Sequence, residues 1–180
     1  MKASVFIATS LDGFIARENG DIDWLMGDEE ESEEDYGFEE FMDTVDYLVM
    51  GRNTFEKVLS FDEWLYGDTP VVVLTHREPE IPERLTGSVE VMSGSPGEIV
   101  HRLSARGAEH LYIDGGKTIQ GFLRAGLIQR LTISTIPVLI GTGIPLFGPL
   151  SQDIKLTLVK TRQYPGGMIQ SEYEVLNTAD

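Results

Sequence analysis

Short apolar runs of strand length recur along the chain, and most are followed by a turn signal or a helical pattern. Runs rich in Val, Ile, Leu and Tyr predict buried strands at residues 3–9, 46–51, 69–77, 89–92 and 110–114. Helical patterns begin soon after three of these strands, at residues 52–59, 95–107 and 117–127. Strands that alternate with helices predict a largely parallel sheet with right-handed crossover connections.

Two further helix signals are specific. Ser95 is a predicted N-cap, Pro96 follows at the first helical position and Gly107 lies past the helix end. A helix is also predicted before the second strand, because apolar residues recur there at i, i+3, i+4 and i+7: Phe38, Phe41, Met42 and Val45. Residues 10–27 are rich in glycine and are expected to form a long irregular segment.

The C-terminal third predicts a change of architecture. Residues 130–141 are interpreted as one long strand that contains Pro137. Two alternating segments, 154–164 and 168–176, flank Pro165-Gly166-Gly167 and predict a hairpin. The chain is therefore expected to form one α/β domain over residues 1–180, with a mixed, mostly parallel sheet and a C-terminal antiparallel hairpin at its edge.

The charge balance excludes several partners. With 14 basic and 30 acidic residues the net charge is −16, so neither a nucleic acid nor an anionic membrane is an expected partner. No apolar run approaches the roughly 20 residues of a membrane span, and the N-terminal apolar stretch is interpreted as a strand. The chain has no cysteine, which fits a cytoplasmic protein. No metal is expected, because the histidines lack ligand spacing, and the acidic residues 28–35 are interpreted as a solvated segment without calcium-loop spacing.

The ends of the predicted strands carry the candidate chemistry. Open α/β sheets bind ligands at the carboxyl ends of their strands. Two helices start there, directly after Gly51 and after Gly115-Gly116, and the free N–H groups of such helix starts suit a phosphate. The alternative is an ordinary glycine turn before a helix. Neither stretch has the spacing of the classical nucleotide fingerprints.

Other polar groups at the strand ends have two interpretations each. Thr75, His76 and Arg77 suit an extra ribose phosphate, or they form a solvated strand end. Asp12 either belongs to an Asp-Gly turn or hydrogen-bonds a heterocycle and assists a proton, and Asp114 has a similar pair of interpretations. Trp24 is a core residue or a cleft-edge aromatic.

The order of several motifs resembles a known family. The stretches ATSLDGFIA, YLVMGRNTFEKV, VVVLTHR and LYIDGGKTIQGFLRAGLIQRLTISTIPVLIGTGIPLF, with the closing hairpin, are similar to the dihydrofolate-reductase-like superfamily. Within it the chain most resembles the reductase domain of the bifunctional riboflavin-biosynthesis deaminase-reductase and its stand-alone relatives. The resemblance implies an eight-stranded sheet with flanking helices, NADPH as the cofactor, a pterin- or pyrimidine-like substrate and a homodimer. The expected activity is like that of 5-amino-6-(5-phosphoribosylamino)uracil reductase.

The resemblance also assigns roles to residues. It implies a cofactor site made by Ala8, Gly13, Gly51, Arg52, Asn53, Thr54, Thr75, His76, Arg77, Gly115, Gly116, Lys117 and Thr118. It implies substrate contacts from Ser10, Asp12, Trp24 and Asp114, with Asp12 as the catalytic residue.

The chain departs from the family pattern in three places. Asp114 stands where riboflavin-type reductases usually have Glu, the deaminase domain is absent, and the acid that follows the Trp in dihydrofolate reductases matches Glu29 only loosely. Dihydrofolate-reductase-type activity, a non-catalytic nucleotide- or pterin-binding module and a dimeric scaffold therefore stay as alternatives.

Overall fold

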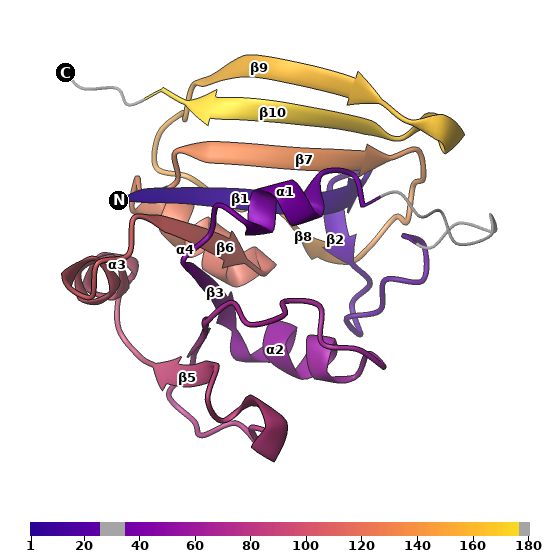
Figure 1. Ribbon diagram of the computed structural model, residues 1–180. Helices are drawn as coiled ribbons and strands as arrows, with labels where there is room; N and C mark the ends of the chain where they lie inside the picture. The colour runs from indigo at the N-terminus through magenta and orange to yellow at the C-terminus, as the bar shows by residue number, and fades with distance from the viewer. Residues whose placement is uncertain (26–34, 177–180) are drawn as a thin grey trace.

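The computed structural model describes residues 1–25 and 35–176. Its main sheet has eight strands in the order β5-β4-β3-β6-β1-β7-β10-β9 (Figure 1). These strands are β1 (Lys2–Ser10), β3 (Tyr47–Gly51), β4 (Val71–Leu74), β5 (Val89–Met92), β6 (His110–Asp114), β7 (Arg130–Ile136), β9 (Leu156–Gln163) and β10 (Ile169–Val175). The strands from β5 to β7 run parallel, whereas β10 is antiparallel to both β7 and β9. The predicted mixed, mostly parallel sheet with a C-terminal antiparallel hairpin is confirmed.

The helices cover the two faces of this sheet in pairs. They are α1 (Phe38–Met42), α2 (Arg52–Leu59), α3 (Pro96–Ala105) and α4 (Gly116–Arg124), with 3-10 turns at Glu83–Leu85 and Pro165–Gly167. Alternate residues of each strand point to opposite faces, so the sheet has two apolar cores. On one face Val5, Val49 and Leu111 pack with α3 and α4, and on the other Leu48 and Met50 pack with α2 and the aromatic residues of α1. We call these the α3/α4 face and the α1/α2 face.

The local helix signals are borne out in part. Ser95 caps α3 in a capping box with Glu98, and Pro96 opens the helix as predicted. Helix α1 is shorter than the apolar pattern from Phe38 to Val45 predicted, since it ends at Met42. The Asp35 carboxylate lies before α1 and accepts from the N–H groups of Gly37 (3.0 Å) and Glu39 (2.8 Å) at the start of this helix.

Two predicted strands are too long. Strand β4 covers only residues 71–74 of the predicted 69–77, so Thr75 to Arg77 follow the strand. Strand β7 ends at Ile136, and the prediction of a strand to residue 141 is wrong. Pro137 has no N–H to continue the ladder, and the Val138 N–H turns back to donate to the Ile136 carbonyl (2.8 Å).

The segment predicted to be irregular contains a strand. Residues Phe14–Ala16 form β2, which pairs with β8 (Ile144–Pro145) in a second, two-stranded sheet. Most of the acidic stretch, residues 28–34, lies outside the described residues, and so does Glu29. In the described ranges, every helix is too short or too polar to cross a membrane.

Candidate functional site at the carboxyl edge of the sheet

The predicted motifs lie side by side at one edge of the sheet. Because β3, β4 and β6 are parallel, their carboxyl ends meet at the same edge. Gly51 is opposite Leu74, so Arg52 begins beside Thr75. Met50 of β3 is opposite Asp114 of β6, so the residues that come next, Gly51 and Gly115, lie beside each other at the ends of these two strands. We call this the carboxyl edge.

The starts of α2 and α4 are packed into each other. The Thr54 hydroxyl of α2 lies where a Cβ on Gly115 would be, and Gly115 has a φ of +88°. In the reverse direction, a Cβ on Gly51 would lie 3.1 Å from the Thr118 hydroxyl of α4. Each helix therefore places a first-turn hydroxyl against the glycine that precedes the other helix.

These two helix starts have no side-chain cap. Neither Gly51 nor Gly115 offers a side chain to the first N–H groups, and the first turns of α2 and α4 hold no acidic residue. Helix α3 also follows a strand to this edge, but Ser95 and Glu98 satisfy its start. The N–H groups and positive dipole ends of α2 and α4 are thus available to an anion, with Arg52 and Lys117 beside them.

A loop from later in the chain covers the start of α4. A Cβ on Gly116 would lie 3.0 Å from the Pro145 carbonyl and 3.2 Å from Ile15, so a larger residue would crowd the β2–β8 sheet that lies over this position. Gly13, with a φ of +87°, accepts from the Leu146 N–H (3.0 Å) through its carbonyl. Sequence reasoning assigned no site residue to this loop, although its glycines after β7 were a signal for it.

Asp12 ties that loop to the end of β1. Its carboxylate accepts from the backbone N–H groups of Ile140 (3.2 Å) and Gly141 (2.8 Å). The Ser10 hydroxyl beside it, followed by these N–H groups, lowers the pKa of Asp12 below its ordinary value. Asp12 is therefore ionised at neutral pH and acts in this structure as an acceptor that holds the loop. Ser10 also accepts from the Phe14 N–H (3.0 Å).

Asp114 is an acid in a different environment. It is half-buried at the end of β6, where it accepts from the Gly115 N–H (2.7 Å) and from the Tyr66 hydroxyl. Burial raises the pKa of Asp114 to about 6 from 3.8, although both hydrogen bonds oppose that change. An acid with this pKa can hold or release a proton near neutral pH.

The remaining predicted residues are spread around the carboxyl edge. After β4, the Arg77 N–H donates to the Thr75 hydroxyl (3.0 Å), while His76 and Arg77 are exposed, as is Asn53 on α2. Ala8 is opposite Ser134 on β7.

Trp24 lies in a separate turn. The ion pair between Asp21 and Lys57 (2.8 Å) fixes this turn to α2. The Trp24 side chain is buried, and its Nε1 has no hydrogen-bond partner in the structure as described. The structure thus joins Gly51, Thr54, Gly115 and Thr118 directly, and Trp24 lies on the turn that Asp21 fixes to α2.

Comparison with known protein families assigns nearly the whole chain to one of them. Residues 2–170 match the RibD C-terminal domain family. The chain belongs to this family. A crystal structure of a Shewanella sp. PV-4 protein named for riboflavin biosynthesis is 42% identical, with a TM-score of 0.92 over 98% of this chain and all of that one. The resemblance seen in the sequence is therefore confirmed.

Two more distant structures confirm the dihydrofolate-reductase-like fold. One is the Thermotoga maritima diaminohydroxyphosphoribosylaminopyrimidine deaminase/5-amino-6-(5-phosphoribosylamino)uracil reductase, with a TM-score of 0.73 and 16% identity over 97% of this chain and 56% of that one. The other is dihydrofolate reductase from Enterococcus faecalis in complex with NADP(H), with a TM-score of 0.66 and 15% identity over 98% of this chain and 97% of that one.

Proposed function

We propose that this RibD C-terminal domain protein is an NADPH-dependent reductase that transfers a hydride to a small pyrimidine- or pterin-like heterocycle. The observation that carries the proposal is the pair of uncapped helix starts on neighbouring strands, each with a hydroxyl and a basic residue in its first turn. Two adjacent sites for phosphate fit a dinucleotide pyrophosphate better than a single phosphate.

The residues at the carboxyl edge fit the parts of this cofactor. Arg52, Thr54, Lys117 and Thr118 would bind the pyrophosphate together with the N–H groups of α2 and α4. Thr75, His76 and Arg77 follow the next strand along, where an exposed guanidinium can pair with the extra ribose phosphate of NADPH. When bound, NADPH supplies the hydride, and the chain supplies orientation and electrostatics.

The acids of the site would have different roles. Asp12 stays ionised, so it would orient the loop 140–141 and the substrate without donating a proton. Asp114, with its pKa of about 6, would hold a hydrogen bond to the heterocycle in either protonation state. The proton that accompanies the hydride would come from water or from the substrate itself. Ser10 and Trp24 would complete the substrate contacts.

The two distant relatives support this substrate and cofactor class. The name of the Thermotoga maritima protein includes a ribosylaminouracil reductase, and the Enterococcus faecalis enzyme was solved with NADP(H). Dihydrofolate is therefore tested as a substrate together with the pyrimidines.

We also propose a homodimer. Large apolar side chains are exposed along the terminal hairpin, at Leu156, Leu158, Val159, Ile169 and Leu176. An exposed apolar patch of this kind on a sheet commonly marks a protein interface.

Turnover tests the proposed activity. The purified protein is incubated with C4-deuterated NADPH and either dihydropterins, dihydrofolate or ribosylaminopyrimidines, and the products are examined by mass spectrometry. Deuterium in a reduced product is the expected result. Binding of NADPH without turnover of any of these compounds would favour a non-catalytic binding module, and no binding at all would favour a scaffold.

A further inference from the structure

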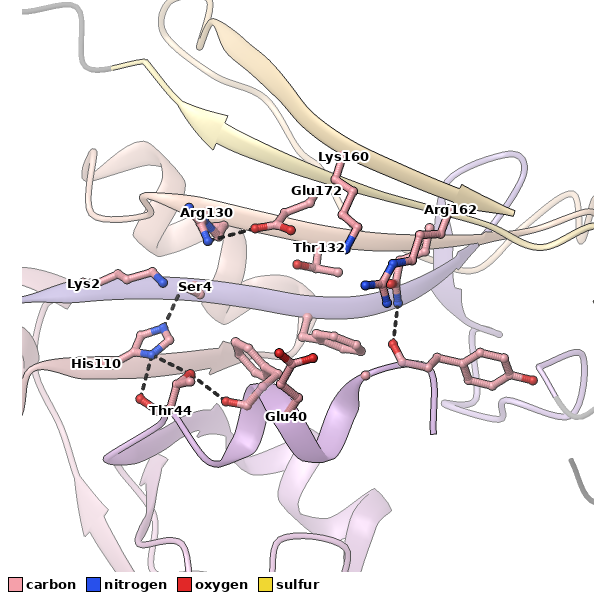
Figure 2. A pocket seen from close by; sticks show the side chains of 15 residues that line it. Lys2, Ser4, Glu40, Thr44, His110, Arg130, Thr132, Lys160, Arg162 and Glu172 are labelled. Carbon is pink, nitrogen blue, oxygen red and sulfur yellow. Dashed lines mark hydrogen bonds and ion pairs between the residues drawn. The ribbon is translucent and has the colours of Figure 1, made fainter. Parts of the chain in front are cut away.

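A cavity of about 270 Å³ lies on the α1/α2 face, away from the carboxyl edge. It is enclosed by α1 on one side and by β1, β7, β9 and β10 on the other (Figure 2). Four basic side chains line it, namely Lys2, Arg130, Lys160 and Arg162, against the two carboxylates of Glu40 and Glu172. In a chain of net charge −16, this local excess of positive charge is the reverse of the general balance.

A β-bulge creates the basic wall of the cavity. Leu158 is opposite Tyr173 and Lys160 is opposite Glu172, so the register shifts by one residue between them. Without the shift, Leu158 and Lys160 would share a face, because side chains alternate along a strand. The bulge therefore leaves Leu158 on the opposite face of the hairpin and turns Lys160 and Arg162 toward α1.

Most of the positive charge in the cavity has no carboxylate partner. Arg130 pairs with Glu172 (2.9 Å) and Glu174 (2.6 Å). Lys2, Lys160 and Arg162 have no carboxylate within ion-pair distance in the described part of the chain. Burial, followed by the charge of Arg130, lowers the pKa of Lys2, while the charges of Glu172 and Glu174 oppose that change; Lys2 and Arg130 therefore repel each other in the cavity. An anion would relieve that repulsion.

Several uncharged polar side chains that line the cavity already have hydrogen-bond partners within the protein. A carbonyl only accepts, so His110 Nδ1 donates to Thr44 O (2.8 Å) and Nε2 accepts from the Ser4 hydroxyl (2.8 Å). Burial lowers the pKa of His110, which keeps the ring neutral. Gln170 donates to the Tyr36 carbonyl (3.0 Å) and to the Ser134 hydroxyl (3.1 Å). These side chains are therefore occupied with partners within the protein. On β9 the Arg162 guanidinium hydrogen-bonds the Tyr164 side chain, which leaves its other N–H groups and the Lys160 ammonium to bind a ligand.

The cavity is separate from the proposed cofactor site. The β1 residues that line it lie toward the amino end of the strand, and the last of them, Phe6, is four residues before Ser10, or about 13 Å at 3.3 Å per residue. The volume is at the low end of small-molecule pockets, which run from about 300 Å³ upward, so it suits a small ligand and excludes a dinucleotide.

We propose that this cavity binds the phosphate monoester of a small hydroxylated molecule. Lys160 and Arg162 would bind the phosphate, since a guanidinium fork and an ammonium together match a dianion. Glu40 and Thr132, which also line the cavity, would accept and donate hydrogen bonds to ligand hydroxyls. The site does not depend on the proposed reductase activity.

Calorimetric titration of the full chain with glycerol 3-phosphate, at low salt and without NADPH, tests this site. The expected result is binding that weakens at least about tenfold in Lys160→Gln and in Arg162→Gln, because each removes a charge-assisted hydrogen bond. Lys155→Gln is the matched control, since Lys155 is exposed just before the same strand and outside the cavity. Glycerol is the uncharged control and should not bind.

Four other results would overturn the proposal. Equal binding in all variants, or none in the wild type, would remove the site. Loss in Arg77→Gln with retention in Lys160→Gln would place the phosphate at the carboxyl edge instead. Inorganic phosphate that binds as tightly as glycerol 3-phosphate would show a site for the free ion, and the assignment to an ester would be wrong.

Discussion

The Thr54 hydroxyl occupies the space that a Cβ on Gly115 would need. Thr54 belongs to the first turn of α2, and Gly115 precedes α4, so one atom couples the two helix starts of the carboxyl edge. The glycines of this motif thus have a packing reason within the chain. That same packing brings two uncapped helix starts together, which is the arrangement that the proposed pyrophosphate site uses.

Gly115→Ala should destabilise the fold and weaken NADPH binding together. The backbone of Gly115, with a φ of +88° and a ψ of 136°, disfavours alanine by about 1–3 kcal/mol, and the contact with Thr54 adds about 1–3 kcal/mol. Urea unfolding and a cofactor titration on the same protein measure the two effects. Gly126→Ala, at the other end of α4, has a φ of +68° but open space, and should show a conformational loss without a steric one.

A double mutant isolates the contact with Thr54. In the Thr54→Ala background, Gly115→Ala should lose less stability than it does in the wild type, because the hydroxyl is gone. If the two substitutions are additive, the proposed coupling between the helix starts is wrong.

Asp12→Asn should loosen the loop that the carboxylate holds. The Ile140 and Gly141 N–H groups donate to different oxygens of the carboxylate, and an amide has an NH₂ donor in place of one of them, so one of the two hydrogen bonds is lost. Hydrogen exchange of these two amides should accelerate, while amides in β3 stay protected. Unchanged exchange at both positions would contradict the role given to Asp12.

Asp114→Asn should change how stability depends on pH. The folded-state pKa of about 6 exceeds the ordinary 3.8, so the folded protein binds the extra proton and loses stability as pH rises between these values. The asparagine variant lacks this loss and should gain up to about 3 kcal/mol on the wild type between about pH 4 and pH 7. Urea unfolding at both pH values measures it, and parallel pH curves for the two proteins would refute the raised pKa.

Leu158→Glu should prevent the proposed dimer. A carboxylate on the exposed apolar face of the hairpin cannot be buried without a partner. Light scattering after size exclusion should give a dimer for the wild type and a monomer for this variant. Leu65→Glu, at another exposed leucine, is the control. A wild type that elutes as a monomer would end the dimer proposal.

Local signals were sufficient to predict most of the fold. Strand β5 and helix α2 have the predicted bounds, and the capping box at Ser95 is present, because each depends on neighbouring residues alone. The pairing of β2 with β8 was not predictable in this way, since each strand is only two or three residues long and the partners are far apart in sequence. Pro137 indicated the end of β7, because proline cannot donate a hydrogen bond to a neighbouring strand.

In the candidate site, too, some features follow from local sequence and others from long-range contacts. The glycines before α2 and α4 pointed to the carboxyl edge, and the parallel register brought them together. The binding of Asp12 to the loop at residues 140–141 depends on a long-range contact that no local pattern encodes. The bulge that turns Lys160 toward α1 is likewise visible only once β9 pairs with β10. The cofactor roles of these residues stay predictions until binding is measured.

The most direct test is a fluorescence titration of the wild type and Arg77→Gln with NADPH and with NADH. We expect micromolar binding of NADPH and much weaker binding of NADH, with loss of this difference in Arg77→Gln but not in Arg84→Gln, a control at another exposed arginine. Equal binding of NADPH and NADH by the wild type would contradict the phosphate role of Thr75, His76 and Arg77. Failure to bind either cofactor would contradict the reductase proposal itself.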